Sequence, residues 1–458
     1  MTRPKSLFSQ GQALYLSREE AQRVGQQALR SATADETRII INSGARANTR
    51  FAENQISTAG DNYNATVTVR SVFGRRVASA STNRLDDESL AQVVQRSEAL
   101  ARLAPEDLEN MPELGPQEYQ AGPQPRETSP PSPAQRAEAV RAISEQARAA
   151  NLVSTGFIVS TMGASAIANS KGLFAYNRSA LSALTTTVRT PDGTGSGWAG
   201  ATHNDWAQMN AAELGQVAIE KAVRSRDPVA IEPGRYTVVL EPTAVANLVQ
   251  LMTGQAIDAR AADEGRSFFS RPGGGTRIGE KVVDERVTIV SDPDDPDLRV
   301  GAFNFEGMPT KRVVWIENGV VRNLNYDRYW AQRQNVEPTA SPGGFRMSGG
   351  DASIADMVAS TQRGILVTRF WYIRPVDPRT ILYTGLSRDG TFLIENGRVT
   401  RSIKNMRWNE SPIFLLNNVE MLGRPVRVNS DESGDGSNVI VPPLKARDFN
   451  FTSLSDAV

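Results

Sequence analysis

Hydrophobic and polar positions alternate along the chain with two periods, about 3.6 residues in segments that predict helices and two residues in segments that predict strands. Both periods occur in the first hundred residues. Ser17 and Glu20 have the spacing of a capping box, which predicts a helix that ends near residue 30. The stretch "TRIIINS" (37–43) predicts a strand, and "TRFAENQIST" (49–58) is its expected hairpin partner.

A second hairpin and a second helix complete this first unit. The stretch "ATVTVRSVFGRRVASAST" alternates at period two on both sides of Phe73-Gly74, where we expect the turn. These elements predict an N-terminal α+β domain over residues 1–104. The helix that follows the hairpin has one apolar face, formed by Leu90, Val93, Val94, Ser97 and Leu100.

Residues 105–133 are rich in proline and separate this unit from the next. We expect an extended surface linker there, because proline lacks the backbone donor that helices and central strands need. A central α+β domain is predicted over residues 134–228. It begins with the helix "AQRAEAVRAISEQARAA" and has short strands on both sides of a turn at Asn169–Gly172.

Residues 229–458 predict a β-rich C-terminal domain, in which "WIENGVV" and "LIENGRV" carry the Asn-Gly signal of a hairpin turn. One helix begins at Pro242 and is expected to pack into this domain. The predicted fold class is α+β, with N-terminal α/β subdomains that contain antiparallel hairpins and a large β-rich C-terminal domain. The apolar stripe of the helix consists of Val245, Leu248, Val249 and Met252.

The charge balance bears on the partners of the protein. Lys and Arg total 51, as do Asp and Glu, so the formal net charge is zero. Proteins that bind nucleic acid or anionic membranes usually have a basic excess, and we therefore expect neither partner. No segment has the apolar length of a signal peptide or of a membrane span, and we expect a cytoplasmic protein.

The chain has no cysteine and a single histidine, His203. Disulfides, thiol nucleophiles and zinc sites built from several Cys and His ligands are thereby excluded. A Ser-His-Asp triad would have to be built around His203. This residue lies in the polar stretch "GATHNDW", which is typical of a turn or surface histidine.

Two loops have motif-like sequences without the residues that the motifs need. "RPGGGTRIGEK" (271–281) lacks the Gly-Lys-Ser/Thr of a phosphate-binding loop, so we expect a glycine loop. "SDPDDPD" (291–297) lacks the central glycine and the distal glutamate of an EF-hand calcium loop, so we expect an acidic turn.

Long phrases of the C-terminal half carry a family resemblance, among them "GRYTVVLEP", "EGRSFFS", "IGEKVVDERVTIVSDP" and "FEGMPTKRVVWIENGVVRNLNYDRYWA". "TRFAENQIST" and "NSKGLFAY" add weaker agreement in the first half. Through these phrases the chain resembles the TldD/PmbA family of metallopeptidase subunits over nearly its whole length. The resemblance implies a pair of related subunits. The TldD type carries an H-E-x-x-x-H zinc motif, and the PmbA or TldE type lacks it.

The resemblance places the motif in "NLVQLMTGQAID". At the two histidine positions this sequence has amide side chains, which are poor zinc ligands, and at the glutamate position it has leucine, which accepts no proton. The cysteine ligand of the family is also missing from "NSDESGDGSN" (429–438). The two histidine positions are about 140° out of register on a regular helix, so we expect the helix to distort or end near the second one. Gln250 stands at the first histidine, Leu251 at the glutamate, Gly254 at the glycine and Gln255 at the second histidine.

The resemblance therefore implies a non-catalytic, PmbA/TldE-like subunit without a metal or other cofactor of its own. Its TldD-like partner would hold zinc and cleave short or unfolded peptides. The four motif positions are expected to line the peptide chamber, and for Gln250 and Gln255 we favour a structural role over contact with peptide. Two alternatives stay open: a stand-alone, homodimeric peptide-binding protein, and an independent peptidase whose metal has oxygen ligands.

Overall fold

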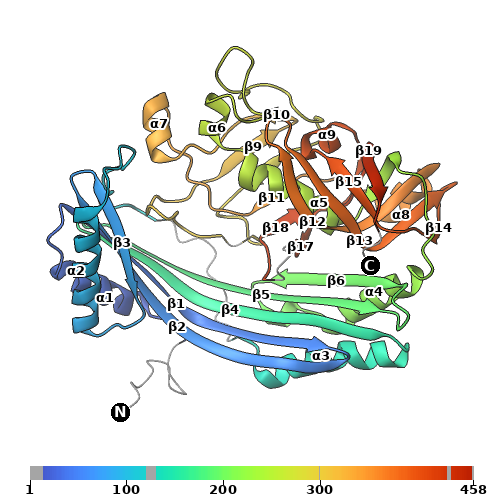
Figure 1. The fold of residues 1–458 in the computed structure, drawn as a ribbon, viewed down its shortest axis with the longest axis horizontal. Coiled ribbons are helices and arrows are strands. Elements are labelled where there is room, and N and C mark those ends of the chain that lie inside the picture. The colour runs from blue at the N-terminus through green and yellow to red at the C-terminus, as the bar shows by residue number, and fades with distance from the viewer. Residues whose placement is uncertain (1–13, 120–129, 299, 431–434, 456–458) are drawn as a thin grey trace.

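The computed structural model describes residues 14–119, 130–298, 300–430 and 435–455. Figure 1 shows two layers, a long curved sheet from the first half of the chain and a C-terminal body that lies over one face of this sheet. The predicted α+β class is confirmed, because helices and mostly antiparallel strands share the chain and the C-terminal half is rich in strands.

The long sheet has six antiparallel strands in the order β3-β2-β1-β4-β5-β6. Strand β1 comes from the predicted N-terminal domain and pairs with β4 of the predicted central domain, so these two segments share one sheet. The predicted turn at Phe73-Gly74 joins β2 to β3 and is confirmed. The strands are β1 (Glu36–Ala52), β2 (Gln55–Phe73), β3 (Arg76–Thr82), β4 (Val153–Asn169), β5 (Phe174–Arg189) and β6 (Ser196–His203).

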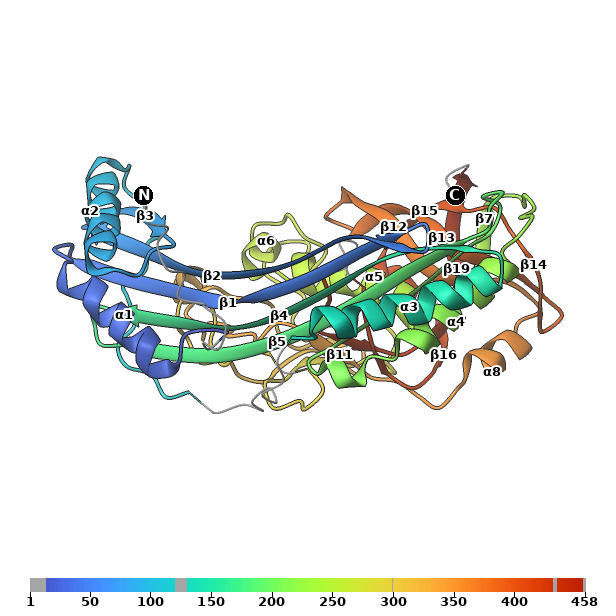
Figure 2. The same cartoon turned by 90° about the horizontal axis from the view of Figure 1, so that it is seen from below.

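Helices cover the other face of the long sheet (Figure 2). Alternation along β1 places Ile39 and Ile41 on this face against α1 and α2, and Phe51 on the same face against α3. The predicted capping box of Ser17 and Glu20 opens α1 and is confirmed. The helices are α1 (Arg18–Arg30), α2 (Asp87–Leu103), α3 (Pro133–Ala149) and α4 (Ala211–Arg224), which lies beside α3, and the 3-10 turn η1 (Trp206–Gln208) precedes α4.

Two details of the predicted elements are wrong. The first hairpin turns at Glu53 and Asn54, whose φ angles are 51° and 61°, so the segment predicted as the partner strand contains the turn. The first ten residues of β2 are exposed on both sides, and no alternation marks them as a strand in the sequence. In α2, Leu100 is 47% exposed, and Ala101 takes its place on the buried face.

The predicted linker has neither helix nor strand over residues 110–119, but it is not confined to the surface. The carboxylate of Glu113 is fully buried. One oxygen accepts a hydrogen bond from Arg38 Nε at 2.7 Å, and the other accepts one from Arg70 Nη1 at 3.0 Å. The expectation of a surface linker is therefore wrong at Glu113, while residues 120–129 of the linker lie outside the described residues.

Five strands of the C-terminal half close into a barrel in the order β7-β19-β15-β13-β12, with β12 returning to β7. Three aromatic residues pack together among these strands, Trp408 and the stacked pair Phe370 and Phe449, whose ring centroids lie 5.4 Å apart. Strands β14 and β16 pair with β13 and β19. The strands are β7 (Gly234–Leu240), β12 (Arg363–Asp377), β13 (Leu382–Glu395), β14 (Arg398–Ser402), β15 (Met406–Glu410), β16 (Val419–Leu422) and β19 (Leu444–Leu454).

A second C-terminal sheet has the order β10-β9-β8-β11-β18-β17. The two predicted Asn-Gly hairpins are confirmed as β9–β10 and β13–β14, with positive φ at Asn318, Gly319, Asn396 and Gly397. The strands are β8 (Ile289–Ser291), β9 (Val313–Glu317), β10 (Val320–Val321), β11 (Phe345–Met347), β17 (Val426–Val428) and β18 (Val439–Val441). Short helices complete the body: α6 (Ala259–Asp263), α7 (Arg328–Gln334), α8 (Ile354–Ala359) and α9 (Pro412–Asn417).

Candidate functional site

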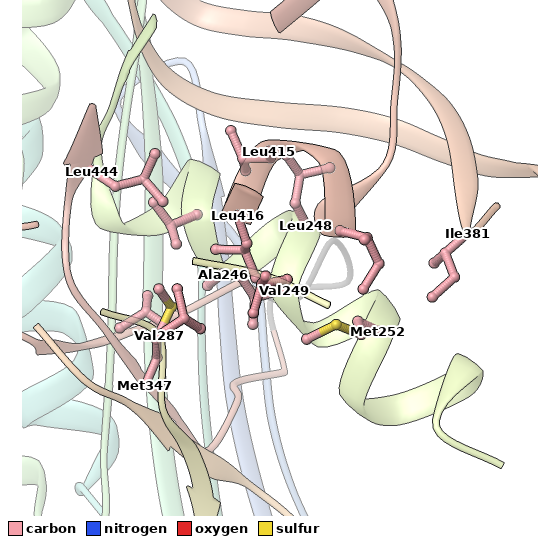
Figure 3. Packing of buried hydrophobic residues seen from close by; sticks show 14 of the residues in the cluster. Ala246, Leu248, Val249, Met252, Val287, Met347, Ile381, Leu415, Leu416 and Leu444 are labelled. Carbon is pink, nitrogen blue, oxygen red and sulfur yellow. The ribbon is translucent and has the colours of Figure 1, made fainter. Parts of the chain in front are cut away.

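Helix α5 (Pro242–Leu251) lies between the barrel and the second C-terminal sheet, in contact with β7, β12, β17 and β18. The surrounding elements bury even the alanines beside the apolar stripe of the helix. Figure 3 shows leucines of α9 packed against the helix. A helix packed on every side holds its last turn in a fixed position. The predicted apolar stripe is confirmed, since all of its members are fully buried: Val245, Leu248, Val249 and Met252.

The helix ends in a π-turn, η2 (Met252–Ala256). The amide of Ile257 donates to the carbonyl oxygen of Met252 at 3.1 Å, five residues back instead of four. The expected distortion near Gln255 is confirmed, although the side chain of Gln255 lies outside the described part of the structure. Steric crowding does not require glycine at Gly254, because open space lies where its Cβ would be.

The polar side of α5 holds a loop that follows β17. The Oγ of Ser430 donates to Gln250 Oε1 at 2.8 Å, and the Nδ2 of Asn247 donates to the Ser430 carbonyl oxygen at 3.0 Å. The Oδ1 of Asn247 accepts a hydrogen bond from the amide of Phe370 at 3.1 Å. The two amide side chains therefore tie the helix to the barrel and to the loop. Sequence reasoning missed Asn247 and Ser430, which are 183 residues apart and share no motif.

A cavity of about 420 Å³ opens at the end of α5. Gln250, Leu251 and Gly254 form one wall of this cavity, so the structure brings three of the four predicted positions together. The second C-terminal sheet supplies the opposite wall, where Trp315 Nε1 donates to Ser291 Oγ at 2.9 Å. The cavity thus combines an aromatic surface with amide and hydroxyl groups, which suits a ligand that has both side chains and backbone amides.

The other candidates from the sequence have structural roles. His203 ends β6, and its Nδ1 accepts a hydrogen bond from the amide of Asp205 at 2.9 Å, which confirms a turn histidine. The acidic turn is confirmed as well. Both oxygens of Asp295 accept hydrogen bonds from Arg346, at 2.7 and 2.9 Å, and Asp297 accepts another from the same guanidinium at 2.7 Å.

Comparison with known proteins identifies the family. Three family models match the chain, described as PmbA/TldA metallopeptidase domain 1, central domain and C-terminal domain, over residues 38–101, 126–226 and 233–453. The first two models match the two halves of the long sheet, β1–β3 and β4–β6, and the third matches the C-terminal body with the barrel and the second sheet. The chain belongs to the PmbA/TldD family.

Relatives within the PmbA/TldD family are distant in sequence. A metalloprotease of Methanothermobacter thermautotrophicus is 25% identical over 233 residues, which are 47% of this chain and 49% of the relative. The zinc metalloprotease TldD homolog of Saccharolobus solfataricus is 23% identical over 218 residues, which are 43% of this chain and 46% of the relative. The chain spans about half the length of the curated relatives it matches.

The fold is shared more widely than the sequence. The crystal structure of TldE from Thermococcus kodakarensis matches with a TM-score of 0.82 and 20% identity, covering 95% of this chain and 100% of that one. At this identity the match shows that the two proteins share a fold.

The zinc motif that the resemblance implies does not fit the residues present here. The amide oxygen of Gln250 already accepts the Ser430 hydroxyl, and Leu251 offers neither a metal ligand nor a proton acceptor. Among the described residues, no three His, Cys, Asp or Glu side chains gather where a metal ion could be held. No step of a zinc reaction can be assigned to this cavity.

Within the described ranges, no helix is both long and apolar enough to cross a bilayer.

Proposed function

We propose that this protein is the non-catalytic, TldE-like subunit of a TldD-type zinc metallopeptidase complex. One observation carries the proposal: Gln250 and Leu251 line a cavity at the end of a buried helix that finishes in a π-turn, and the family resemblance implies a zinc ligand and the general base at these two positions. Zinc and the general base then belong to a TldD-like partner. The likeness in fold to the Thermococcus TldE supports the same assignment.

The role of this chain is to supply a wall of the chamber in which the partner cleaves short or unfolded peptides. An extended peptide presents free backbone amides together with side chains. Asn438 presents its side-chain amide to such a chain, and Trp315 and Phe345 present apolar surface. A folded protein presents neither in a form that enters a cavity of about 420 Å³. We place this complex in the cytoplasm, without nucleic acid or membrane as a partner.

Co-purification tests the assembly. The protein is co-expressed with a TldD-like chain that carries H-E-x-x-x-H, and the tagged complex is analysed by size-exclusion chromatography. We expect a stable heteromer. A matched partner in which both motif histidines are replaced by alanine is expected to assemble equally well, because this chain contributes no metal ligand. A stable homodimer that leaves such a partner unbound would contradict the proposal and favour the stand-alone peptide-binding protein.

A further inference from the structure

A second cavity, of about 460 Å³, lies on the other side of the π-turn. Ala256 at the end of η2 and Ala261 of α6 line one side, and the turn between β12 and β13 lines the other. The amide of Phe268 donates to the carbonyl oxygen of Pro378 at 3.2 Å and holds the two sides together. The residues that line the first cavity from η2 are Thr253 and Gly254, so the two cavities share this turn as a wall.

The interior of the second cavity is apolar. Ile381 and Tyr383, which are 1% and 6% exposed and belong to the hydrophobic core, lie beneath it, and the half-buried Leu382 lies between them. With Ala256 and Ala261 opposite, these side chains leave an apolar hollow of a size typical of ligand pockets.

The rim of the second cavity carries an arginine that has no carboxylate partner within the described part of the chain. Arg379 is exposed, and its guanidinium makes no hydrogen bond or ion pair with any described residue. Asp377 also lies on the rim and keeps its negative charge, but its oxygens accept from the Arg379 amide at 2.9 Å and from Thr380 Oγ1 at 2.8 Å and form no ion pair with the Arg379 guanidinium. The second rim arginine, Arg266, contacts Glu264. Arg379 is therefore available to an anion.

We propose that the second cavity binds the C-terminal residue of a peptide, with its apolar side chain in the hollow and its free α-carboxylate on Arg379. A C-terminal residue is the part of a peptide in which a carboxylate and an apolar side chain share one carbon atom. An internal residue lacks the charge, and an N-terminal residue has the opposite charge. Guanidinium binds carboxylate through paired hydrogen bonds, which favours arginine at such a site. The inference rests on the proposed function, in which this chain holds peptides.

Fluorescence anisotropy with an N-terminally labelled hexapeptide that ends in leucine tests this site. The free acid is expected to bind the wild-type protein about tenfold more tightly than the C-terminal amide. Arg379→Gln is expected to remove this preference by weakening the free acid alone. The matched control is Arg401→Gln on β14, an exposed arginine outside the cavity, which is expected to keep the preference. Competition with unlabelled N-acetylleucine distinguishes a site for peptides from a site for any apolar acid. Only a site for any apolar acid predicts that this compound competes as well as the peptide does.

Several outcomes would overturn the proposal: equal affinity of acid and amide for the wild type, no binding of the acid at about 1 mM, equal competition by N-acetylleucine, or the same loss in both arginine variants. Ala261→Leu narrows the hollow and is expected to weaken the binding of a peptide ending in leucine more than the binding of one ending in glycine. Equal effects would refute the claim that the apolar side chain occupies the hollow. Thermal unfolding checks that each variant is folded. Capture of the TldD-like partner distinguishes failure of this proposal from failure of the proposed function. Arg379→Gln is expected to capture the partner as the wild type does, because the second cavity is not needed for assembly. A wild-type protein that captures no partner would refute the proposed function alone.

Discussion

Glu410 makes the stability of the barrel depend on pH. It ends β15 and is 4% exposed. One carboxylate oxygen accepts from the Ser411 amide at 2.8 Å, and the other accepts from the Asn450 amide at 3.1 Å. Burial raises the pKa of Glu410 from 4.5 to about 7, because loss of water around the charge outweighs the two backbone donors and the attraction of Arg235.

The direction of the effect follows from proton binding. Between pH 4.5 and about 7 the folded state binds more protons at Glu410 than the unfolded state does. The free energy of unfolding therefore falls as the pH rises through this window. The loss of unfolding free energy caused by the buried, ionised Glu410 is absent below pH 4.5 and complete above about pH 7. At about 1.4 kcal/mol for each pH unit, it amounts to about 3 kcal/mol.

The assay compares the wild type with Glu410→Gln, which keeps the shape of the side chain but does not titrate. Urea unfolding is followed by tryptophan fluorescence at pH 4.5, 5.5, 6.5 and 7.5, values chosen to span the window of about 4.5 to 7. All other titrating groups are common to both proteins, so the difference between their curves isolates Glu410. We expect the variant to gain about 3 kcal/mol relative to the wild type between the lowest and the highest pH. Parallel curves would refute a raised pKa at this carboxylate.

Three further predictions concern packing and the site. Leu248→Ala, in a fully buried position, should cost about 2–5 kcal/mol of unfolding free energy in urea titrations, whereas Leu103→Ala, 84% exposed, should cost almost nothing. Gly319→Ala should lower the melting temperature, because its φ is +78° and a Cβ would lie 2.3 Å from a carbonyl oxygen; an unchanged value would contradict this. Gln250→Ala should speed amide hydrogen exchange after β17, and unchanged protection there would argue against the observed hydrogen bond.

Features that depend on neighbouring residues could be predicted from the sequence. The capping box at Ser17 forms with both of its hydrogen bonds, and the Asn318-Gly319 turn has the positive φ angles that this pair favours. The turn at Glu53-Asn54 also has positive φ angles but contains no glycine, and for this reason the residue pattern does not predict it. Turns and helix caps can therefore be predicted where the backbone conformation nearly requires one residue type.

Features that join distant segments could not be predicted. The barrel closes through the parallel pair of β7 and β12, whose paired residues are more than a hundred positions apart. Periodicity identifies strands but does not say which strands pair. Glu113 is a similar case. Its carboxylate is buried because Arg38 and Arg70 reach it from β1 and β2, and no residue near it in the sequence indicates these partners.

For the site, the family resemblance located one wall and the structure supplied the rest. The positions of Gln250, Leu251 and Gly254 at the cavity follow from aligned phrases. The opposite wall with Trp315 comes from another sheet. The second cavity, with Arg379 on its rim, joins residues that belong to no motif. Such sites arise from tertiary packing.

The most direct test of the central claim is the cleavage rate of an unstructured peptide, measured for this protein alone, for a TldD-like chain alone and for the equimolar mixture. We predict cleavage by the mixture that a chelator abolishes, and no cleavage by this protein alone, because Gln250 and Leu251 supply neither a zinc ligand nor a general base. Chelator-sensitive cleavage by this protein alone would contradict the account and favour an independent peptidase with oxygen-ligated metal.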